Sequence, residues 1–255
     1  TPKFNGFANE WRDKEDAQDV VATQLGDINI RYELEECIDM PPNSVQTLYV
    51  VLPPKVRAAY DLLAEDSVLY TKAGTINAVH AGARVKKLLQ LCTGAVYDDR
   101  GEALGIHKER YALVIDLVAS RKHSLVAFNW RHEREHLTKE ADKLGIVYGI
   151  LDGSISVKER TRTVREFQDG KLQTIFAHPQ TAGHGLTLTK ATTVIWCSPT
   201  YNAEQFEQFN RRIYRAGQTR KTQTILIAAK NTWEPSVFEK LQSKLDRMEN
   251  LLDLL

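Results

Sequence analysis

Short apolar runs alternate with amphipathic segments from about residue 109 to the end of the chain, and this alternation limits the possible folds more than any other feature. The apolar runs, each of strand length, are 124–129, 146–151, 172–178, 192–198 and 222–229. The segments with helical periodicity are 109–120, 131–144, 156–168, 203–214 and 235–252. Continuously apolar strands separated by helices are typical of a parallel sheet that helices cover on both faces. We therefore predict an α/β fold built on such a sheet.

The first part of the chain is patterned more weakly. Residues 1–45 are charged and only weakly periodic, and we interpret them as an N-terminal, mainly helical extension. Residues 46–255 are expected to form the main domain, including a helical segment over 53–120. The elements expected in its first half are a strand at 46–52, helices at 55–63 and 75–91, and a turn at 97–105.

Composition sets limits on the class of protein. The charges nearly balance, with 34 Lys and Arg against 33 Asp and Glu, so a local patch would have to hold any polyanion. Cys37, Cys92 and Cys197 show no CxxC spacing, which argues against disulfides and zinc and indicates core residues in a reducing compartment. No apolar run approaches the ~20 residues that span a bilayer, so we expect a cytoplasmic protein without membrane contact. Because the chain opens with Thr1-Pro2, we expect a piece of a longer protein or a processed product.

Ligands of parallel α/β sheets bind at the carboxyl ends of the strands. In this chain, the loops at these ends are those that follow Asn129, Leu151, His178 and Ser198. In the loop HPQTAGHGLTLTKA (178–191), Gly183 and Gly185 can let the backbone approach a phosphate, and Thr181 offers a hydroxyl. The same glycines can equally serve only to turn the chain. The two loop histidines have no third ligand nearby, so hydrogen-bonded histidines are favoured over a metal site.

Two other loops contain groups suited to a nucleic-acid backbone. In LDGSISVKERTRTVREF (151–167), Gly153 and Ser154 precede a helix that is rich in cations. In FNWRHER (128–134), Asn129 and Trp130 follow a strand, where the indole could stack on a base. The alternatives are a solvated basic helix face for the first loop and an inward-packed tryptophan for the second.

The stretch QFEQFNRRIYRAGQ (205–218) places Arg212 and Arg215 three residues apart near the end of an expected helix. Between residues 209 and 222 there are five cations and no acid, a pattern that suits contact with phosphate oxygens. A salt-bridged surface helix is the alternative. The chain contains no GxxxxGK[ST] sequence, so it has no P-loop for binding a nucleotide by itself.

Taken together, these loops resemble the motifs of the second RecA-like lobe of superfamily 2 helicases, most closely Swi/Snf-type DNA translocases and their phage-encoded members. LVAFNW resembles motif IV, LDGSIS with KER resembles motif IVa, and HPQTAGHGLTL resembles motif V. SPTYNAEQFEQFNRRIYRAGQ resembles the DPxWNP segment that runs into motif VI, QxxxRxxRxGQ. The similarity covers about 125–230 in order and spacing, and weaker similarity reaches back to about residue 40.

The resemblance implies that Gln208, Arg212 and Arg215 face ATP bound on a first lobe, with Arg215 as the arginine finger. Gly183 and Gly185 would line the cleft between the lobes. The first lobe, which would hold most of the ATP and Mg²⁺, is absent from this chain, so we expect no ATPase activity from the chain alone. We also expect the arginines to have no evident role within this lobe.

The resemblance further implies that Thr181, Gly153, Ser154 and Asn129 contact phosphates of a tracked strand in duplex DNA, without sequence preference. The intact protein would be an ATP-driven DNA translocase of a bacterial cell, encoded by a phage or prophage. Three positions depart from the family pattern, which usually has Asp, Trp and Asn where this chain has Ser198, Tyr201 and Thr187.

Two other functions are compatible with parts of the sequence. The chain could be a stand-alone nucleic-acid-binding or protein-binding module that keeps the shape without catalysis. A Rossmann dinucleotide enzyme is disfavoured because no GxGxxG follows a strand.

Overall fold

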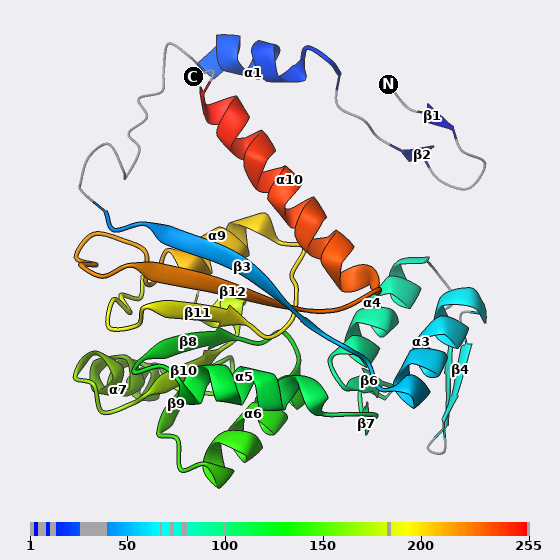
Figure 1. Ribbon diagram of the computed structural model, residues 1–255. Helices are drawn as coiled ribbons and strands as arrows, with labels where there is room; N and C mark the ends of the chain where they lie inside the picture. The colour runs from blue at the N-terminus through cyan, green and yellow to red at the C-terminus, as the bar shows by residue number, and fades with distance from the viewer. Residues whose placement is uncertain are drawn as a thin grey trace. The chain divides into compact units, whose positions relative to one another are not determined.

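The computed structural model describes residues 3–4, 9–10, 14–25, 40–66, 68–71, 74–77, 81–98, 100–182 and 185–253 (Figure 1). The chain divides into two compact units, one of residues 40–241 and one of residues 1–39 with 242–255. In the described part of residues 1–39, the longest element is the nine-residue helix α1 (Ala17–Leu25). The sheet and the loops of interest belong to the first of these units.

In chain order, the elements are β1 (Lys3–Phe4), β2 (Asn9–Glu10), α1 (Ala17–Leu25), β3 (Asn43–Val50), α3 (Pro54–Asp66), β4 (Val68–Thr71), β5 (Gly74–Asn77), α4 (Ala81–Cys92), β6 (Ala95–Tyr97), β7 (Ala103–Gly105), α5 (Glu109–Ala119), β8 (Ser124–Ala127), α6 (Arg131–Lys143), β9 (Tyr148–Leu151), α7 (Val157–Gln168), β10 (Thr174–Ala177), α8 (Pro179–Ala182), β11 (Thr193–Trp196), α9 (Ala203–Asn210), β12 (Thr222–Ala229) and α10 (Trp233–Asp253).

The main sheet has six strands in the order β3-β12-β11-β8-β10-β9, and every neighbouring pair is parallel (Figure 1). This confirms the parallel sheet predicted from the apolar runs. β3 is the first strand of this sheet in the chain, yet it pairs with the last one, β12, from Asn43 opposite Thr222 to Val50 opposite Ala229. The strand β12 has the predicted bounds. The strands β8, β10 and β11 end one or two residues before their predicted ends, and β9, β10 and β11 begin one or two residues after their predicted starts.

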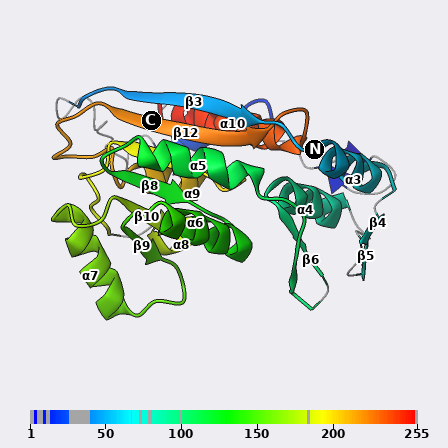
Figure 2. The same ribbon diagram turned by 60° about the horizontal axis from the view of Figure 1, so that its bottom comes forward.

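Helices cover both faces of the sheet, as predicted. Because successive strand residues point to opposite faces, Ile195 and Trp196 of β11 pack into different layers. Ile195 belongs to the core that α5 and α6 form with the strands, and these two helices run next to each other (Figure 2). Trp196 packs on the other face against Phe206 and Phe209 of α9, with ring centroids 4.9 and 5.2 Å away.

The segment between β3 and α5 differs from its prediction in two places. The helix expected over 75–91 does not begin at Thr75, because residues 74–77 pair with β4, with Gly74 opposite Thr71. The β-branched residues Thr75 and Ile76 suit this hairpin better than a helix, which here begins only at Ala81. The expected turn over 97–105 is the end of a second hairpin, β6–β7, in which the Asp98 carboxylate accepts hydrogen bonds from the backbone N–H groups of Arg100 and Glu102, both at 2.9 Å.

Helices α3 and α4 build a second core beside the carboxyl ends of β3 and β12. Val56, Tyr60 and Leu63 of α3 pack here with Leu88 and Leu91 of α4. Cys92 lies in this core and Cys197 in the core of the main sheet, which confirms their prediction as core residues, while Cys37 lies outside the described residues.

A fully buried ion pair joins elements that are far apart in the sequence. The guanidinium of Arg110, at the start of α5, pairs with the carboxylate of Glu234, at the start of α10. Arg110 also donates to the carbonyl of Cys197 at the end of β11 (2.7 Å), and Glu234 accepts from the backbone N–H of Ala229 (2.6 Å). This pair therefore holds the carboxyl ends of β11 and β12 in place, at the edge of the sheet where ligands are expected.

Candidate functional site

Three neighbouring strands bring their following loops together at the carboxyl edge of the sheet. Because β8, β10 and β9 are adjacent and parallel, Asn129, the loop 152–154 and the loop after His178 meet there. They form a pocket of about 390 Å³, called the strand-end pocket below, lined by Phe128, Asn129, Arg131, Arg134, Asp152, Gly153, Ser154, His178, Gln180 and Thr181. All four residues predicted to contact DNA line it. Their contact with DNA stays a prediction.

The strand-end pocket carries more positive than negative charge. Arg131 and Arg134 come from the first turn of α6, and the one carboxylate that lines the pocket, Asp152, is already engaged. It pairs with Arg134 at 2.7 Å and accepts from the backbone N–H and the hydroxyl of Ser154, at 2.9 and 2.6 Å. Partial burial acts to raise the pKa of Asp152, but the hydrogen bonds from Ser154 and Arg134 outweigh it and hold the pKa below its ordinary value. Asp152 therefore stays ionised and fixes the turn that presents Gly153.

The imidazole of His178 adds no charge to the strand-end pocket at neutral pH. Burial lowers the pKa of His178 below its ordinary value of 6.5, although Asp152 and the Asn129 backbone act in the opposite direction. The ring lies edge-on to Phe128, with centroids 6.0 Å apart. The neutral ring therefore forms a wall of the pocket. The cationic groups of the pocket are those of Arg131 and Arg134.

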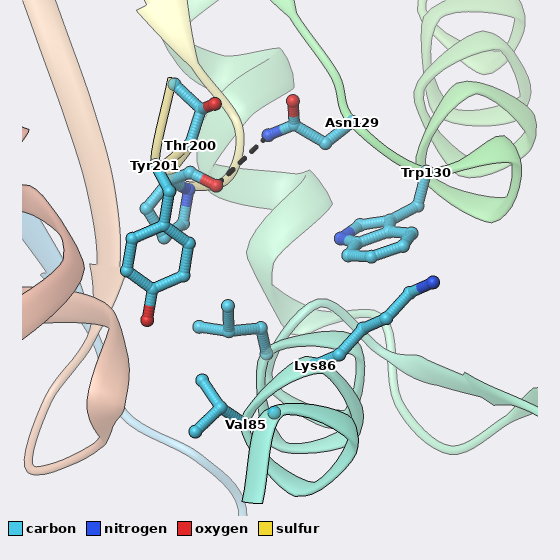
Figure 3. A pocket seen from close by; sticks show the side chains of 9 residues that line it. Val85, Lys86, Asn129, Trp130, Thr200 and Tyr201 are labelled. Carbon is cyan, nitrogen blue, oxygen red and sulfur yellow. Dashed lines mark hydrogen bonds between the residues drawn. The ribbon is translucent and has the colours of Figure 1, made fainter. Parts of the chain in front are cut away.

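A second cavity adjoins the strand-end pocket on the other side of Asn129. This cavity, called the Trp130 groove below, has a volume of about 550 Å³ and is lined by Gly82, Val85, Lys86, Leu89, Asn129, Trp130, Pro199, Thr200 and Tyr201. Figure 3 shows Trp130 and Tyr201 on opposite sides of it, with Val85 and Lys86 between them. It lies between α4 and the loops that follow β8 and β11, and most of its lining is apolar.

The buried carboxylate of Glu133 organises the ends of β8 and β11. Its Oε2 accepts hydrogen bonds from the backbone N–H groups of Asn129 (2.7 Å) and Trp130 (2.9 Å) and from the hydroxyl of Ser198 (3.1 Å). The Asn129 amide in turn donates to Ser198 Oγ at 2.9 Å and to the carbonyl of Pro199 at 3.2 Å. Burial raises the pKa of Glu133 to about 7, against the hydrogen bonds and the charge of Arg110. One side chain thus fixes the loop after β8, which lines both cavities, and the start of the loop after β11.

Arg212 and Arg215 lie away from both cavities, and their backbone differs from the prediction. The helix expected over 203–214 ends at Asn210, because the chain turns there and the carbonyl of Arg212 accepts from the backbone N–H of Leu188 at 2.9 Å. Both guanidiniums donate to the carbonyl of Leu186, at 3.3 Å from Arg212 and 3.1 Å from Arg215. Contrary to expectation, the two arginines therefore have a role within this lobe, since they hold the loop that follows α8.

The structure describes two of the other three residues expected to face a nucleotide, Gln208 and Gly185. The side chain of Gln208 donates to the Glu204 carboxylate on the same helix at 2.8 Å. Gly185 has a φ of +67°, and the space around its Cβ position is open. This position therefore favours glycine because of its backbone conformation, whereas a side chain would meet no steric clash. Gly183 lies outside the described residues. The nucleotide-facing role of all five residues stays a prediction.

Sequence reasoning missed three functional candidates, namely Glu133, Arg134 and Asp152. The sequence does contain a signal for Asp152, because Asp-Gly-Ser is typical of a turn in which the carboxylate caps the following N–H groups. Glu133 occupies the third position of α6, where a glutamate commonly accepts from the N–H group before the helix. Among the described residues, no cluster of His, Cys, Asp and Glu could hold a metal ion, and no described helix is long and apolar enough to cross a membrane.

Comparisons with known proteins match the sequence of this chain to helicase domains. The helicase conserved C-terminal domain matches residues 109–217. Putative protein p41 of Acyrthosiphon pisum secondary endosymbiont phage 1 is 28% identical over 238 residues, which are 90% of this chain and 50% of that protein. Protein CHROMATIN REMODELING 24 of Arabidopsis thaliana is 25% identical over 182 residues, 69% of this chain and 17% of that protein. The chain thus spans about half the length of the phage relative and a smaller part of the plant one.

A solved structure has the same fold. The C-terminal part of the Fun30 ATPase domain superposes with a TM-score of 0.59, covering 79% of this chain and 90% of that chain at 14% identity. At such low identity the likeness concerns the fold alone, and it confirms the predicted RecA-like arrangement of sheet and helices.

Proposed function

We propose that this chain is one half of an ATP-driven motor that moves along DNA. The reason is that the chain belongs to the Swi/Snf-type superfamily 2 helicases, as their C-terminal RecA-like lobe. The observation that carries this proposal is the convergence of Asn129, Gly153, Ser154 and Thr181 in one pocket with two arginines. In this proposal the strand-end pocket grips the DNA backbone, and the first lobe supplies the nucleotide site. The phage relative supports an origin in a phage or prophage, and hence a place in the bacterial cytoplasm.

The strand-end pocket suits a phosphate for steric and electrostatic reasons. Gly153 and Ser154 are exposed and small, so a phosphate can approach the backbone there. Arg131 and Arg134 supply charge, and Thr181 supplies a hydroxyl. Because Arg134 is held by Asp152 in the absence of DNA, its guanidinium is already oriented toward the pocket. Such contacts read no bases, so binding should be independent of sequence and sensitive to salt.

The arginine pair suits the γ-phosphoryl group of ATP held by a first lobe. Arg212 and Arg215 bring two cations to one neutral carbonyl, that of Leu186. Burial lowers the pKa of Arg212, and the charge of Arg215 adds to this effect, so an anion between them would be stabilised. Arg215 would act as the arginine finger, with Arg212 and Gln208 beside it. Mg²⁺ would neutralise phosphate charge from the other lobe, since this sequence has no P-loop.

The proposal is tested by measuring DNA binding and ATP hydrolysis with the 255-residue chain. Wild-type protein should bind a fluorescent duplex with an affinity that falls steeply with salt. Arg134→Ala should weaken binding about 10-fold and reduce the salt slope by about one, because one phosphate contact is lost. Lys230→Ala removes an exposed cation that does not line the pocket and serves as the control for net charge.

ATP hydrolysis separates the half-motor from an independent enzyme. The chain alone should hydrolyse no ATP with or without DNA. If it showed DNA-stimulated hydrolysis that Arg215→Ala abolished, the half-motor proposal would be wrong. In a protein that also contains a first lobe, the same substitution should abolish hydrolysis and leave duplex binding intact.

A stand-alone DNA-binding module is the second candidate function. One observation favours it, namely that Arg212 and Arg215 are both engaged with Leu186 and so have a structural use without a nucleotide. In a module of this kind, Arg215→Ala would lower the stability of the fold without affecting any hydrolysis. A reading frame that encodes a GxGKT sequence and a DExx box before Thr1 would favour the motor over the module.

A further inference from the structure

The Trp130 groove has a mostly apolar lining, and its chemistry suits a flat aromatic group. Val85 and Leu89 of α4 make the groove apolar, and Trp130 and Tyr201 face each other across it (Figure 3). Its volume of about 550 Å³ is ample for one nucleobase. We propose that the Trp130 groove holds an unpaired nucleobase of a DNA strand whose backbone lies in the strand-end pocket. This inference rests on the DNA-binding function proposed above.

The indole of Trp130 is fixed by the neighbouring residues. Its backbone N–H donates to Glu133 at 2.9 Å, and its ring lies 6.2 Å from that of Tyr97, tilted by 39°. The ammonium group of Lys86 lies 5.9 Å from the centre of the indole ring. A ring held in this way loses little freedom when a base stacks on it, which makes it an effective stacking platform.

Asn129 supplies a polar group at the edge of the groove. Its amide NH₂ donates to Ser198 and to the carbonyl of Pro199, which fixes the orientation of the side chain. Figure 3 shows Asn129 at the edge of the groove. No described residue donates to its Oδ1, so this oxygen can accept from the exocyclic amino group of adenine, cytosine or guanine. An apolar peptide side chain would fill the groove without using this acceptor or the charge of Lys86. The combination therefore favours a base.

The groove and the strand-end pocket share Asn129, and three consecutive residues contribute to their linings. Asn129 lines both cavities, Trp130 lines the groove, and Arg131 lines the strand-end pocket. A nucleotide could therefore place its phosphate on one side of Asn129 and its base on the other. A base inside a paired duplex is stacked and cannot enter, so the groove should favour DNA with an unpaired base.

The test compares three DNA ligands by fluorescence anisotropy. They are a fully paired duplex, the same duplex with a short single-stranded gap, and the gapped duplex with abasic residues in the gap. Wild-type protein should bind the gapped duplex about 10-fold more tightly than the paired one, the magnitude of one stacked base, and abasic residues should remove this preference. Trp130→Ala should remove the preference as well, whereas Trp130→Phe should retain part of it.

Two controls make the outcome specific. Trp233→Ala removes an exposed tryptophan that does not line the groove, and should keep the preference for gapped DNA. Circular dichroism of each variant verifies folding, and Trp130→Phe keeps an aromatic ring if Trp130→Ala fails to fold.

The results also separate this inference from the proposed function. If wild-type protein binds duplex DNA through Arg134 but treats base-containing and abasic gaps alike, the groove takes no base, and an apolar peptide side chain becomes the better occupant. If wild-type protein binds none of the three DNA ligands, the DNA-binding function itself is wrong.

Discussion

Replacing Glu133 by glutamine should change how the stability of this lobe depends on pH. Glu133 is fully buried, and burial raises its pKa to about 7, whereas the ordinary value is 4.5. Below pH 4.5 the carboxyl group is protonated in both the folded and the unfolded state. Between these values the folded state holds a proton that the unfolded state has lost, so the free energy of unfolding falls as the pH rises through 7.

The magnitude follows from the two pKa values. The difference between about 7 and 4.5 corresponds to about 3 kcal/mol of unfolding free energy, lost between pH 4.5 and pH 8. Glutamine does not titrate, and its carbonyl can still accept from Asn129, Trp130 and Ser198. Its amide NH₂ would replace Oε1, a buried atom without a partner among the described residues, and this cost is independent of pH. The variant should therefore gain stability relative to wild type as the pH rises.

Urea unfolding at several pH values between 5 and 8 measures this difference. The unfolding free energy of Glu133→Gln minus that of wild type should rise by up to about 3 kcal/mol across this range. Glu135→Gln, an exposed position on the same helix, is the matched control and should follow wild type at every pH. Parallel curves for Glu133→Gln and wild type would refute the reasoning, because they would mean that Glu133 is ionised in the folded state throughout.

Three further substitutions test the packing around the site by thermal or urea unfolding. Arg110→Met should cost about 3–5 kcal/mol because it leaves the Glu234 charge buried without a partner, and adding Glu234→Gln should recover part of that loss. Gly149→Ala should cost about 1–3 kcal/mol because its Cβ would lie 2.4 Å from Cγ2 of Thr163, and Thr163→Ser, which lacks this methyl group, should relieve the clash. Asn202→Ala should cost about 1 kcal/mol because the asparagine side chain caps α9 with a hydrogen bond of 2.9 Å, and an unchanged midpoint would contradict that role.

The parallel sheet could be predicted because its inner strands are buried on both faces, which leaves continuous apolar runs such as TQTILIAA at 222–229. Local pattern was insufficient where pairing across the chain decides the structure. Residues 74–77 form a strand because they pair with β4, and α9 stops at Asn210 where the chain turns and a backbone bond from Leu188 to Arg212 follows. The partner of Arg212 lies outside any local window, whereas β4 directly precedes residues 74–77 in the chain.

The candidate site was predictable to a similar degree. The four residues expected to contact DNA meet because parallel strands end at one edge of a sheet, which follows from the fold class alone. The position of Arg134 opposite Asp152 depends on how α6 packs against the sheet, and the sequence does not indicate this pairing. The Trp130 groove is lined partly by α4. The position of α4 relative to the loop after β11 depends on the packing of the second core, which the sequence does not indicate.

The pairing of β3 with β12 has a consequence for biosynthesis. Asn43 and Thr222, whose side chains are hydrogen-bonded across these strands, are separated by 179 residues. At a translation rate of about 5–20 residues per second, β3 would wait roughly 10–35 s after its own synthesis for β12, its one neighbour among the described strands of the sheet. A ribosome that stops before residue 222 would therefore release a chain whose first sheet strand has no place to dock. An unpaired β3 exposes backbone N–H and C=O groups that can pair with another chain, so we expect chains truncated before β12 to aggregate more readily than complete ones.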